Sequence, residues 1–416
     1  MRQGIGWLSA TLLVVANMVG TGIYTTTGFI VAELPAGTGV LFLWLLGGMA
    51  ALGGALSYAE LAKRYTRSGG EYYFLGQLYH PFLGYLAGLV SLVAGFGAPI
   101  AASAYAFAAY LPLPLSAPQR KIAASLLILT LMIVHFLGLQ KSARIQNLFV
   151  SVKIALLLLL IGGALWPSSE IPAQELSCPA WTWDTVQVSA VSLIFISFAY
   201  SGWNAAAYIM SEIPDAARVV PRAILTGTLL VMGLYLAFNW VLLRYVPLEE
   251  LAGQPAVGRI LAQKLWGAAG DKIFGWGVSL ALVSSVSAML MIAPRVASVM
   301  GEDYPRLSPL AQRNAAGAPV RALLSVAGLA ILFIFSAAFD AILNYIGFTL
   351  SIFSGLTVAG LFWRHHREKG LPWDLGLLFL AVTGWMVVNN FWMRPWESIA
   401  GILTLLVVGS SYFWLR

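Results

Sequence analysis

Long apolar runs, separated by short clusters of charged residues or of Pro and Gly, are the dominant pattern of this chain. A bilayer helix needs roughly 20 consecutive apolar residues, and on this criterion we expect twelve membrane spans. These runs are continuous and do not alternate polar with apolar residues, so they indicate helices rather than the strands of a barrel. The expected spans are Trp7–Val31, Gly39–Leu61, Phe82–Leu111, Ile122–Leu139, Ile145–Leu165, Thr185–Ser211, Ala223–Val246, Ile273–Val299, Val320–Phe339, Ala341–Trp363, Leu375–Asn390 and Ile399–Leu415.

The composition supports this interpretation and excludes other classes of protein. Of the 416 residues, 59% are apolar and 10% are charged, whereas a soluble domain is about 45–50% apolar and about 25% charged. A soluble enzyme and a disordered chain are therefore excluded. We expect an all-α polytopic membrane protein in which residues 1–416 form a single membrane domain.

The Lys and Arg residues are distributed unevenly between the two sides of the membrane. If the N-terminus is cytoplasmic, sixteen of the 24 lie on the inner side, seven lie on the outer side, and Lys153 lies inside a span. Cytoplasmic loops carry an excess of basic residues, so this bias predicts that both termini are cytoplasmic. The net charge of +7 is thereby explained, and we expect no nucleic-acid partner.

The first span contains Gly and hydroxyl residues where a bilayer helix is normally rich in Leu. Residues Met18–Gly28 read MVGTGIYTTTG. Glycine lowers the cost of non-helical backbone, and an unwound turn would expose N–H groups that suit a carboxylate. The same small residues would also permit close helix packing, so the pattern leaves a break and close packing both open.

The sixth span contains a similar cluster of small and polar residues. Residues Phe195–Tyr208 read FISFAYSGWNAAAY, and an unwound turn there would free carbonyl groups that suit an ammonium. Spans one and six occupy corresponding positions of a five-plus-five inverted repeat, a common place for discontinuous transporter helices. This coincidence favours a break in both spans. It predicts repeat one at about 7–165, repeat two at about 185–363 and two extra helices at about 375–415.

Lys153 lies about a third of the way along the fifth span. A charge at bilayer depth costs ~2.5–3.5 kcal/mol on insertion scales, which indicates a functional residue, although a long side chain could also snorkel toward the headgroups. An ammonium facing the bundle would need acceptors, such as carbonyl groups near Gly20–Gly22 or hydroxyl groups of the eighth span. It could then replace a bound sodium ion or carry a proton, and the sequence leaves these two roles open.

Several chemical groups are missing from the spans. We find no carboxylate in mid-span near either expected break, whereas a site for a cationic side chain or a polyamine would need one. The chain also lacks the HExxH, GxSxG and Walker patterns, which weighs against a membrane hydrolase or an ATP-driven pump. We expect no cofactor and no metal. The pocket lining that we expect is apolar and aromatic, with Ile23, Tyr24, Phe198, Tyr200 and Trp203.

Four segments, spread over both halves of the chain, together resemble a known family. They are VGTGIY in the first span, Ser57–Leu75, FAYSGWN followed by Ser211–Ile224, and Asn344–Gly360. In this order they resemble the amino acid–polyamine–organocation (APC) superfamily, and within it the L-type (LAT-like) amino acid transporters and their bacterial relatives. The resemblance implies a LeuT-like fold of five plus five helices with two extra helices.

The resemblance also implies a substrate site at the two breaks. The carboxylate of an amino acid would meet the first break, the ammonium would meet the second, and Phe198 matches the family's aromatic gate. The matching positions are Thr21, Gly22 and Ile23 for the carboxylate, Phe198, Ala199 and Ser201 for the ammonium, and Trp203 and Asn204 directly after the second break.

Lys153 matches a family lysine that replaces the second sodium site, with Gly20 and Ser285 beside it. The resemblance therefore favours sodium independence. Animal relatives carry a cysteine between spans three and four that tethers a glycoprotein subunit. That loop here, Pro112–Arg120, has none, so we expect no disulfide-linked glycoprotein subunit.

These observations lead to one expected function and its alternatives. We expect a sodium-independent exchanger or facilitator of neutral L-amino acids in a cell membrane, such as a bacterial inner membrane. A proton-coupled amino acid symporter and a cationic amino acid or polyamine antiporter are the alternatives within transporters.

Overall fold

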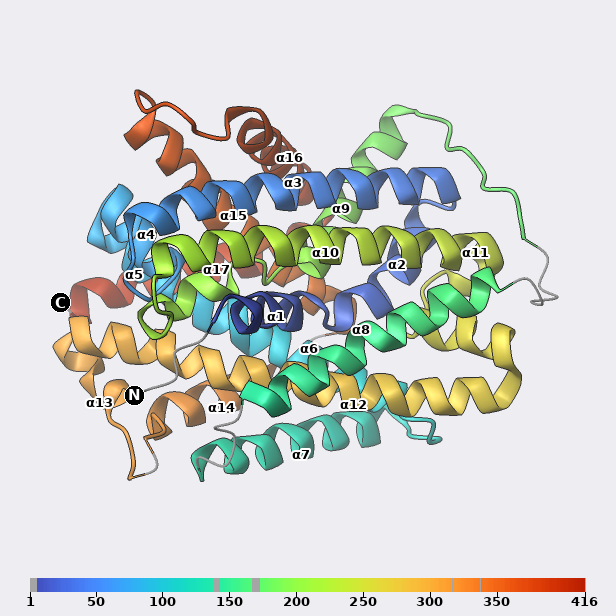
Figure 1. Ribbon diagram of the computed structural model, residues 1–416, viewed down its shortest axis with the longest axis horizontal. Helices are drawn as coiled ribbons and strands as arrows, with labels where there is room; N and C mark the ends of the chain where they lie inside the picture. The colour runs from blue at the N-terminus through green and yellow to red at the C-terminus, as the bar shows by residue number, and fades with distance from the viewer. Residues whose placement is uncertain (1–5, 138–142, 167–172, 316, 337, 416) are drawn as a thin grey trace.

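The protein is a bundle of helices, and its longest helices, α3, α10 and α12, run roughly parallel along the long axis in Figure 1. The computed structural model describes residues 6–137, 143–166, 173–315, 317–336 and 338–415, and these contain no strand. The helices are α1 (Trp7–Met18), α2 (Thr21–Glu33), α3 (Gly37–Arg64), α4 (Glu71–Leu78), α5 (Pro81–Val90), the π-helix η1 (Ser91–Gly97), α6 (Ala98–Tyr110), α7 (Ala117–Phe136), α8 (Ala143–Leu165), α9 (Trp183–Tyr200), the 3₁₀ helix η2 (Ala205–Glu212), α10 (Ala216–Tyr245), α11 (Leu248–Leu251), α12 (Val257–Asp303), the 3₁₀ helix η3 (Pro305–Leu307), α13 (Ser308–Ala311), α14 (Val320–Ser336), α15 (Phe339–His365), α16 (Trp373–Met393) and α17 (Pro395–Leu415).

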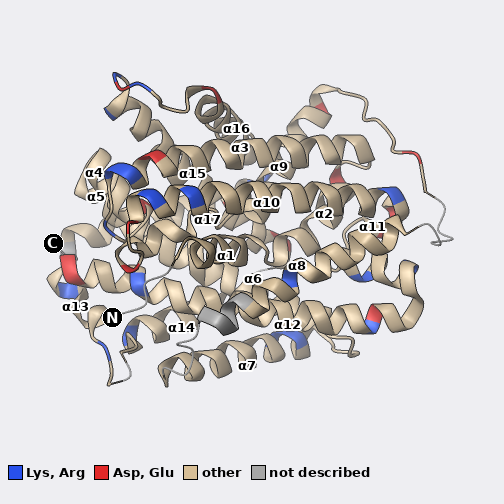
Figure 2. Cartoon of the chain, in the orientation of Figure 1, with Lys and Arg blue, Asp and Glu red and all other residues tan. Residues whose placement is uncertain are grey.

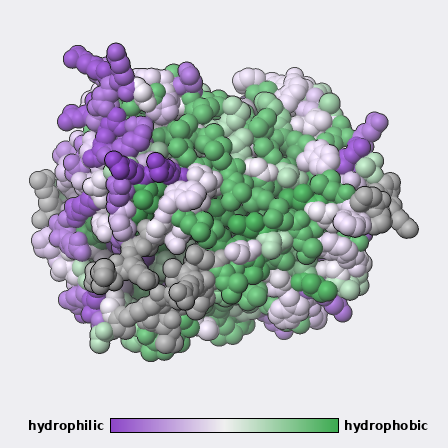
Figure 3. Space-filling model, in the orientation of Figure 1, coloured by the Kyte–Doolittle hydropathy of each residue, from purple (hydrophilic) through white to green (hydrophobic). Residues whose placement is uncertain are grey.

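The arrangement confirms an all-α polytopic membrane protein. Within the described residues, eleven segments are long and apolar enough to cross a membrane, and they match eleven of the twelve expected spans. The remaining expected span corresponds to α14, which has 17 residues, the lower limit for a crossing; the count of twelve stays a prediction. On the face shown in Figure 3, apolar residues form a broad central band, and Figure 2 shows most charged residues toward its two ends.

The segment between the seventh and eighth expected spans contains helices that the apolar pattern did not indicate. The expected outer loop 247–272 is largely helical, because it contains α11 and the first part of α12, which bends at Gly267 (φ +66°). Charged residues such as Arg259 interrupt the apolar pattern there, so hydropathy alone did not indicate these helices. Three basic residues counted on the inner side, Arg2, Lys141 and Arg416, lie outside the described residues.

Close packing between α3 and α9 fixes the end of α9. A Cβ atom on Gly48 of α3 would lie 2.8 Å from the hydroxyl oxygen of Tyr200, the last residue of α9. The Tyr200 hydroxyl donates to the carbonyl oxygen of Trp44 at 3.2 Å. A small residue thus lets the two helices approach, and the tyrosine anchors the point at which α9 ends.

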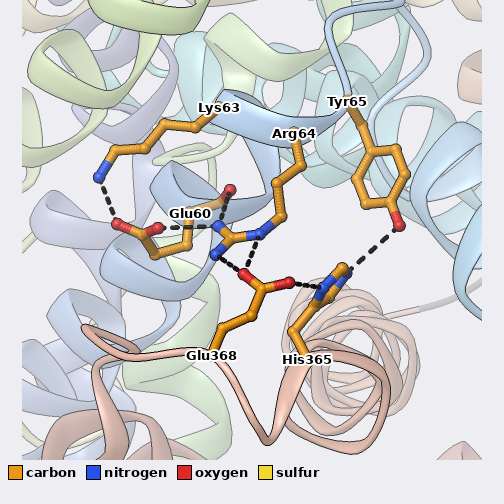
Figure 4. A network of polar contacts seen from close by, with 6 residues as sticks. All are labelled: Glu60, Lys63, Arg64, Tyr65, His365 and Glu368. Carbon is orange, nitrogen blue, oxygen red and sulfur yellow. Dashed lines mark hydrogen bonds and ion pairs between the residues drawn. The ribbon is translucent and has the colours of Figure 1, made fainter.

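A polar network joins the end of α3 to the connection between α15 and α16 (Figure 4). Arg64 donates to Glu60 at 2.8 Å and to Glu368 at 2.5 Å. Glu368 also contacts His365 at 2.7 Å, and the Tyr65 hydroxyl lies 3.4 Å from that imidazole. Exposed ion pairs contribute little stability, so the network chiefly defines a charged, solvated end of the bundle.

Candidate functional site

The first span is interrupted between α1 and α2. α1 ends at Met18 and α2 begins at Thr21, with Gly20 in a non-helical conformation (φ −123°, ψ −143°). The Gly20 N–H donates to the Met18 carbonyl at 2.8 Å, whereas in a continuous helix it would donate to the carbonyl of Ala16. No side chain caps the start of α2. The break that the sequence left open is therefore confirmed, and the first N–H groups of α2 lack helical partners.

Lys153 donates to the carbonyl group of Ala16, which the first break leaves without its helical donor, the N–H group of Gly20. Its side chain is 1% exposed, and its Nζ atom donates to the Ala16 carbonyl at 3.1 Å and to the Ser285 hydroxyl at 2.7 Å. Snorkelling is thus excluded, because the ammonium points into the bundle and satisfies a buried carbonyl. A Cβ atom on Gly20 would lie 3.9 Å from the Ser285 hydroxyl oxygen. The structure therefore brings Lys153, Gly20 and Ser285 together.

The sixth span is interrupted between α9 and η2. α9 ends at Tyr200 and η2 begins at Ala205. Gly202 has φ +97°, a conformation that glycine adopts most readily. A Cβ atom there would also lie 2.8 Å from the carbonyl carbon of Asn17 in α1. Glycine at this position permits the turn and its close approach to the first span.

The two breaks lie against each other. A Cβ atom on Gly22 would lie 2.4 Å from the Cα atom of Ala199. The hydroxyl of Tyr235 in α10 is positioned to donate to the carbonyl of Met18 at 2.6 Å and to that of Ala199 at 3.2 Å. Sequence analysis missed Tyr235. A buried tyrosine hydroxyl needs a hydrogen-bond partner, and its position in mid-span is the signal that could have identified it.

A cavity lies on the side of the second break that faces α3, η1, α15 and α16. Four of the proposed site residues, Phe198, Ser201, Trp203 and Asn204, line it. Five residues that we expected at the site are not in this lining: Thr21, Gly22, Ile23, Tyr24 and Ala199. The tight contact between α2 and α9 explains the difference, because it leaves no space between the two breaks in this conformation.

A buried carboxylate from outside the expected spans also lines the cavity, although we expected none in mid-span near the breaks. Glu71, the first residue of α4, is 5% exposed. It accepts hydrogen bonds from the Tyr58 hydroxyl at 2.7 Å, from the Asn204 amide at 2.5 Å and from the Tyr208 hydroxyl. Glu71 follows the second span in the sequence and was assigned to a loop. Only the fold shows that α4 carries it to the cavity.

Comparisons with known proteins agree with this architecture. The model of the amino acid permease family matches residues 5–413. The chain is 26% identical to the human Asc-type amino acid transporter 1, covering 99% of this chain and 82% of that protein. It is also 26% identical to the human b(0,+)-type amino acid transporter 1, over 99% of this chain and 88% of that protein. The chain is 24% identical to the human large neutral amino acids transporter small subunit 2, over 99% of this chain and 80% of that protein.

The resemblance to the APC superfamily is thereby confirmed, because the family match extends over nearly the whole chain. The relatives are transporters and not enzymes. The chain therefore belongs to the amino acid permease family and is an amino acid transporter.

Proposed function

We propose that this protein is a sodium-independent exchanger or facilitator of neutral L-amino acids that works by alternating access. The observation that carries the proposal is the meeting of two helix breaks inside the bundle, with Lys153 bound to the first. At the breaks, peptide groups of opposite polarity are released from regular helical hydrogen bonding at one place. They suit a zwitterion, because N–H groups bind a carboxylate and carbonyl groups bind an ammonium.

The substrate occupies a position between the breaks when α2 and α9 separate. In the described conformation Gly22 contacts Ala199, so binding requires a hinge movement at the non-helical residues. Hinges of this kind are formed by a few residues at the ends of elements. The proposed contacts are Thr21, Gly22 and Ile23 with the carboxylate, Phe198, Ala199 and Ser201 with the ammonium, and Trp203 and Asn204 beside them.

Sodium independence follows from the position of the Lys153 ammonium. It contacts a carbonyl oxygen and a hydroxyl oxygen, and oxygen atoms are the ligands of hard metal cations. A lysine side chain that already occupies these acceptors disfavours the binding of a metal cation there.

Neutral side chains fit the apolar and aromatic lining that Phe198 and Trp203 provide. Glu71 favours a second candidate, a cationic amino acid or polyamine antiporter, because it adds a carboxylate to the cavity. Its oxygen atoms already accept three hydrogen bonds, so we place neutral substrates first. A proton-coupled symporter is the remaining alternative, and Lys153 and Glu71 are the ionisable groups that it would use.

The proposed architecture is a single membrane domain, residues 1–416, with inverted repeats at 7–165 and 185–363 and extra helices at 375–415. The presence of a break in the first helix of each repeat supports it. We place both termini in the cytoplasm and the protein in a cell membrane, such as a bacterial inner membrane, from the distribution of basic residues. We propose no disulfide-linked subunit; the only cysteine of the chain, Cys178, lies before α9 and not between α6 and α7.

Counterflow in liposomes containing the purified protein tests this function. The proposal predicts saturable uptake of labelled L-alanine or L-leucine that is accelerated by unlabelled amino acid on the other side and is unchanged when sodium is replaced by choline. Stronger inhibition by arginine or agmatine than by leucine would favour the cationic antiporter. Accumulation driven by an imposed pH gradient would favour the symporter.

A further inference from the structure

Glu71 joins three separate segments around the cavity. Its donors come from Tyr58 of α3, from Asn204 directly after the second break, and from Tyr208 of η2. The ion pairs between described residues do not include Glu71. All three hydrogen bonds are therefore accepted from neutral groups, two by one carboxyl oxygen and one by the other.

This carboxylate determines which way the amide of Asn204 faces. An amide has one donor end and one acceptor end, and both side-chain oxygen atoms of Glu71 accept hydrogen bonds. The Asn204 nitrogen, 2.5 Å from Glu71, must therefore point to Glu71, and its oxygen points elsewhere. Asn204 is half-buried and lines the cavity, and among the described residues its side-chain oxygen has no protein donor. The end of the amide that does not face Glu71 is thus an acceptor.

We propose that Glu71 is a positioning residue that orients the Asn204 amide so that its oxygen accepts a hydrogen bond from the substrate's ammonium. This inference rests on the proposed function and adds a side-chain acceptor to the carbonyl groups of the second break. The acceptor lies three residues after Ser201, on the side where the ammonium is proposed to bind. A freely rotating amide would offer its donor end equally well. That end would bind the substrate's carboxylate and so favour a reversed orientation of the amino acid.

Exchanging the two polar groups tests the inference. Glu71→Gln keeps the side-chain shape but removes the obligatory acceptor, and we expect the KM for L-alanine in liposomes to rise about tenfold. Asn204→Asp places two carboxylates at hydrogen-bond distance, and we expect a similar or larger rise. In Glu71→Gln/Asn204→Asp the donor and the acceptor are exchanged, so the hydrogen bond forms again and an acceptor still faces the cavity. The KM then returns to within about threefold of the wild-type value.

The control and the alternative outcomes separate this inference from the proposed function. Glu368→Gln removes an exposed carboxylate that does not line the cavity and is expected to leave the KM unchanged. If wild-type protein shows no exchange of amino acids, the proposed function fails. If the wild-type protein exchanges amino acids and Glu71→Gln keeps its KM, the inference is wrong. If Glu71→Gln does not elute as a folded protein on size exclusion, the comparison of the double variant with Asn204→Asp decides: equal KM values would overturn the inference.

Discussion

The Lys153→Met substitution removes the buried ammonium and nearly keeps the length of the side chain. In the structure the Nζ atom donates to the Ala16 carbonyl at 3.1 Å and to the Ser285 hydroxyl at 2.7 Å. Methionine can donate to neither. The carbonyl freed by the first break then loses this partner, and α1 loses its polar link to α12.

The expected effects on stability and on transport differ. Hydrogen bonds to charged groups contribute about 1.5–3 kcal/mol each, so the two contacts of Lys153 account for about 3–6 kcal/mol. Removing a charge from bilayer depth returns ~2.5–3.5 kcal/mol. The two effects largely cancel, so the melting temperature should change little. The position of the break is no longer fixed. If the free energy of the transport-competent conformation rises by only about 1.4 kcal/mol relative to the others, its population falls tenfold. We expect transport to fall at least tenfold.

The measurements are counterflow of L-alanine in liposomes and thermal unfolding of the purified protein. Lys272→Met is the matched control, because Lys272 is exposed, and it is expected to keep the wild-type rate. A Lys153→Met protein that transports at the wild-type rate would refute the reasoning. So would a loss of activity explained wholly by failure to insert or fold.

Three further substitutions test the geometry of the breaks by the same counterflow assay. Phe198→Ala removes an aromatic ring from the cavity and should abolish most transport, whereas Trp7→Ala, at an exposed helix start, should not; equal rates would contradict a gate. Gly22→Ala places a Cβ atom 2.4 Å from the Cα atom of Ala199, so the breaks must separate, and transport should fall by more than tenfold. Tyr235→Phe removes the hydroxyl between the two breaks. Loss of a hydrogen bond worth about 1–1.5 kcal/mol should slow exchange about tenfold; an unchanged rate would show that the bridge is dispensable.

Much of the architecture could be predicted from the sequence because the bilayer imposes strong constraints on it. Apolar length alone located eleven of the twelve expected spans, and the cost of a buried charge identified Lys153. The glycine and threonine residues between Met18 and Gly28 indicated that the helix could be interrupted there, but local sequence could not distinguish a break from close packing. The structure shows both, because the chain breaks at Gly20 and packs closely at Gly22.

The remaining features depend on tertiary structure. Glu71 reaches the cavity only because the fold places the start of α4 there, and hydropathy assigned that segment to a loop. Tyr235 acquires its role from two carbonyl groups on other helices. The contact between Gly22 and Ala199 depends on which conformation of the transport cycle is adopted. No pattern within a single segment contains this information.

The central claim is that both charged ends of an amino acid are bound, one at each helix break. Competition against labelled L-leucine by its single-charge analogues, isopentylamine and 4-methylpentanoate, tests this claim most directly in liposomes containing the wild-type protein. The account predicts that unlabelled L-leucine inhibits strongly and that each analogue, at tenfold higher concentration, inhibits weakly or not at all. Inhibition by either analogue as strong as that by leucine would contradict it.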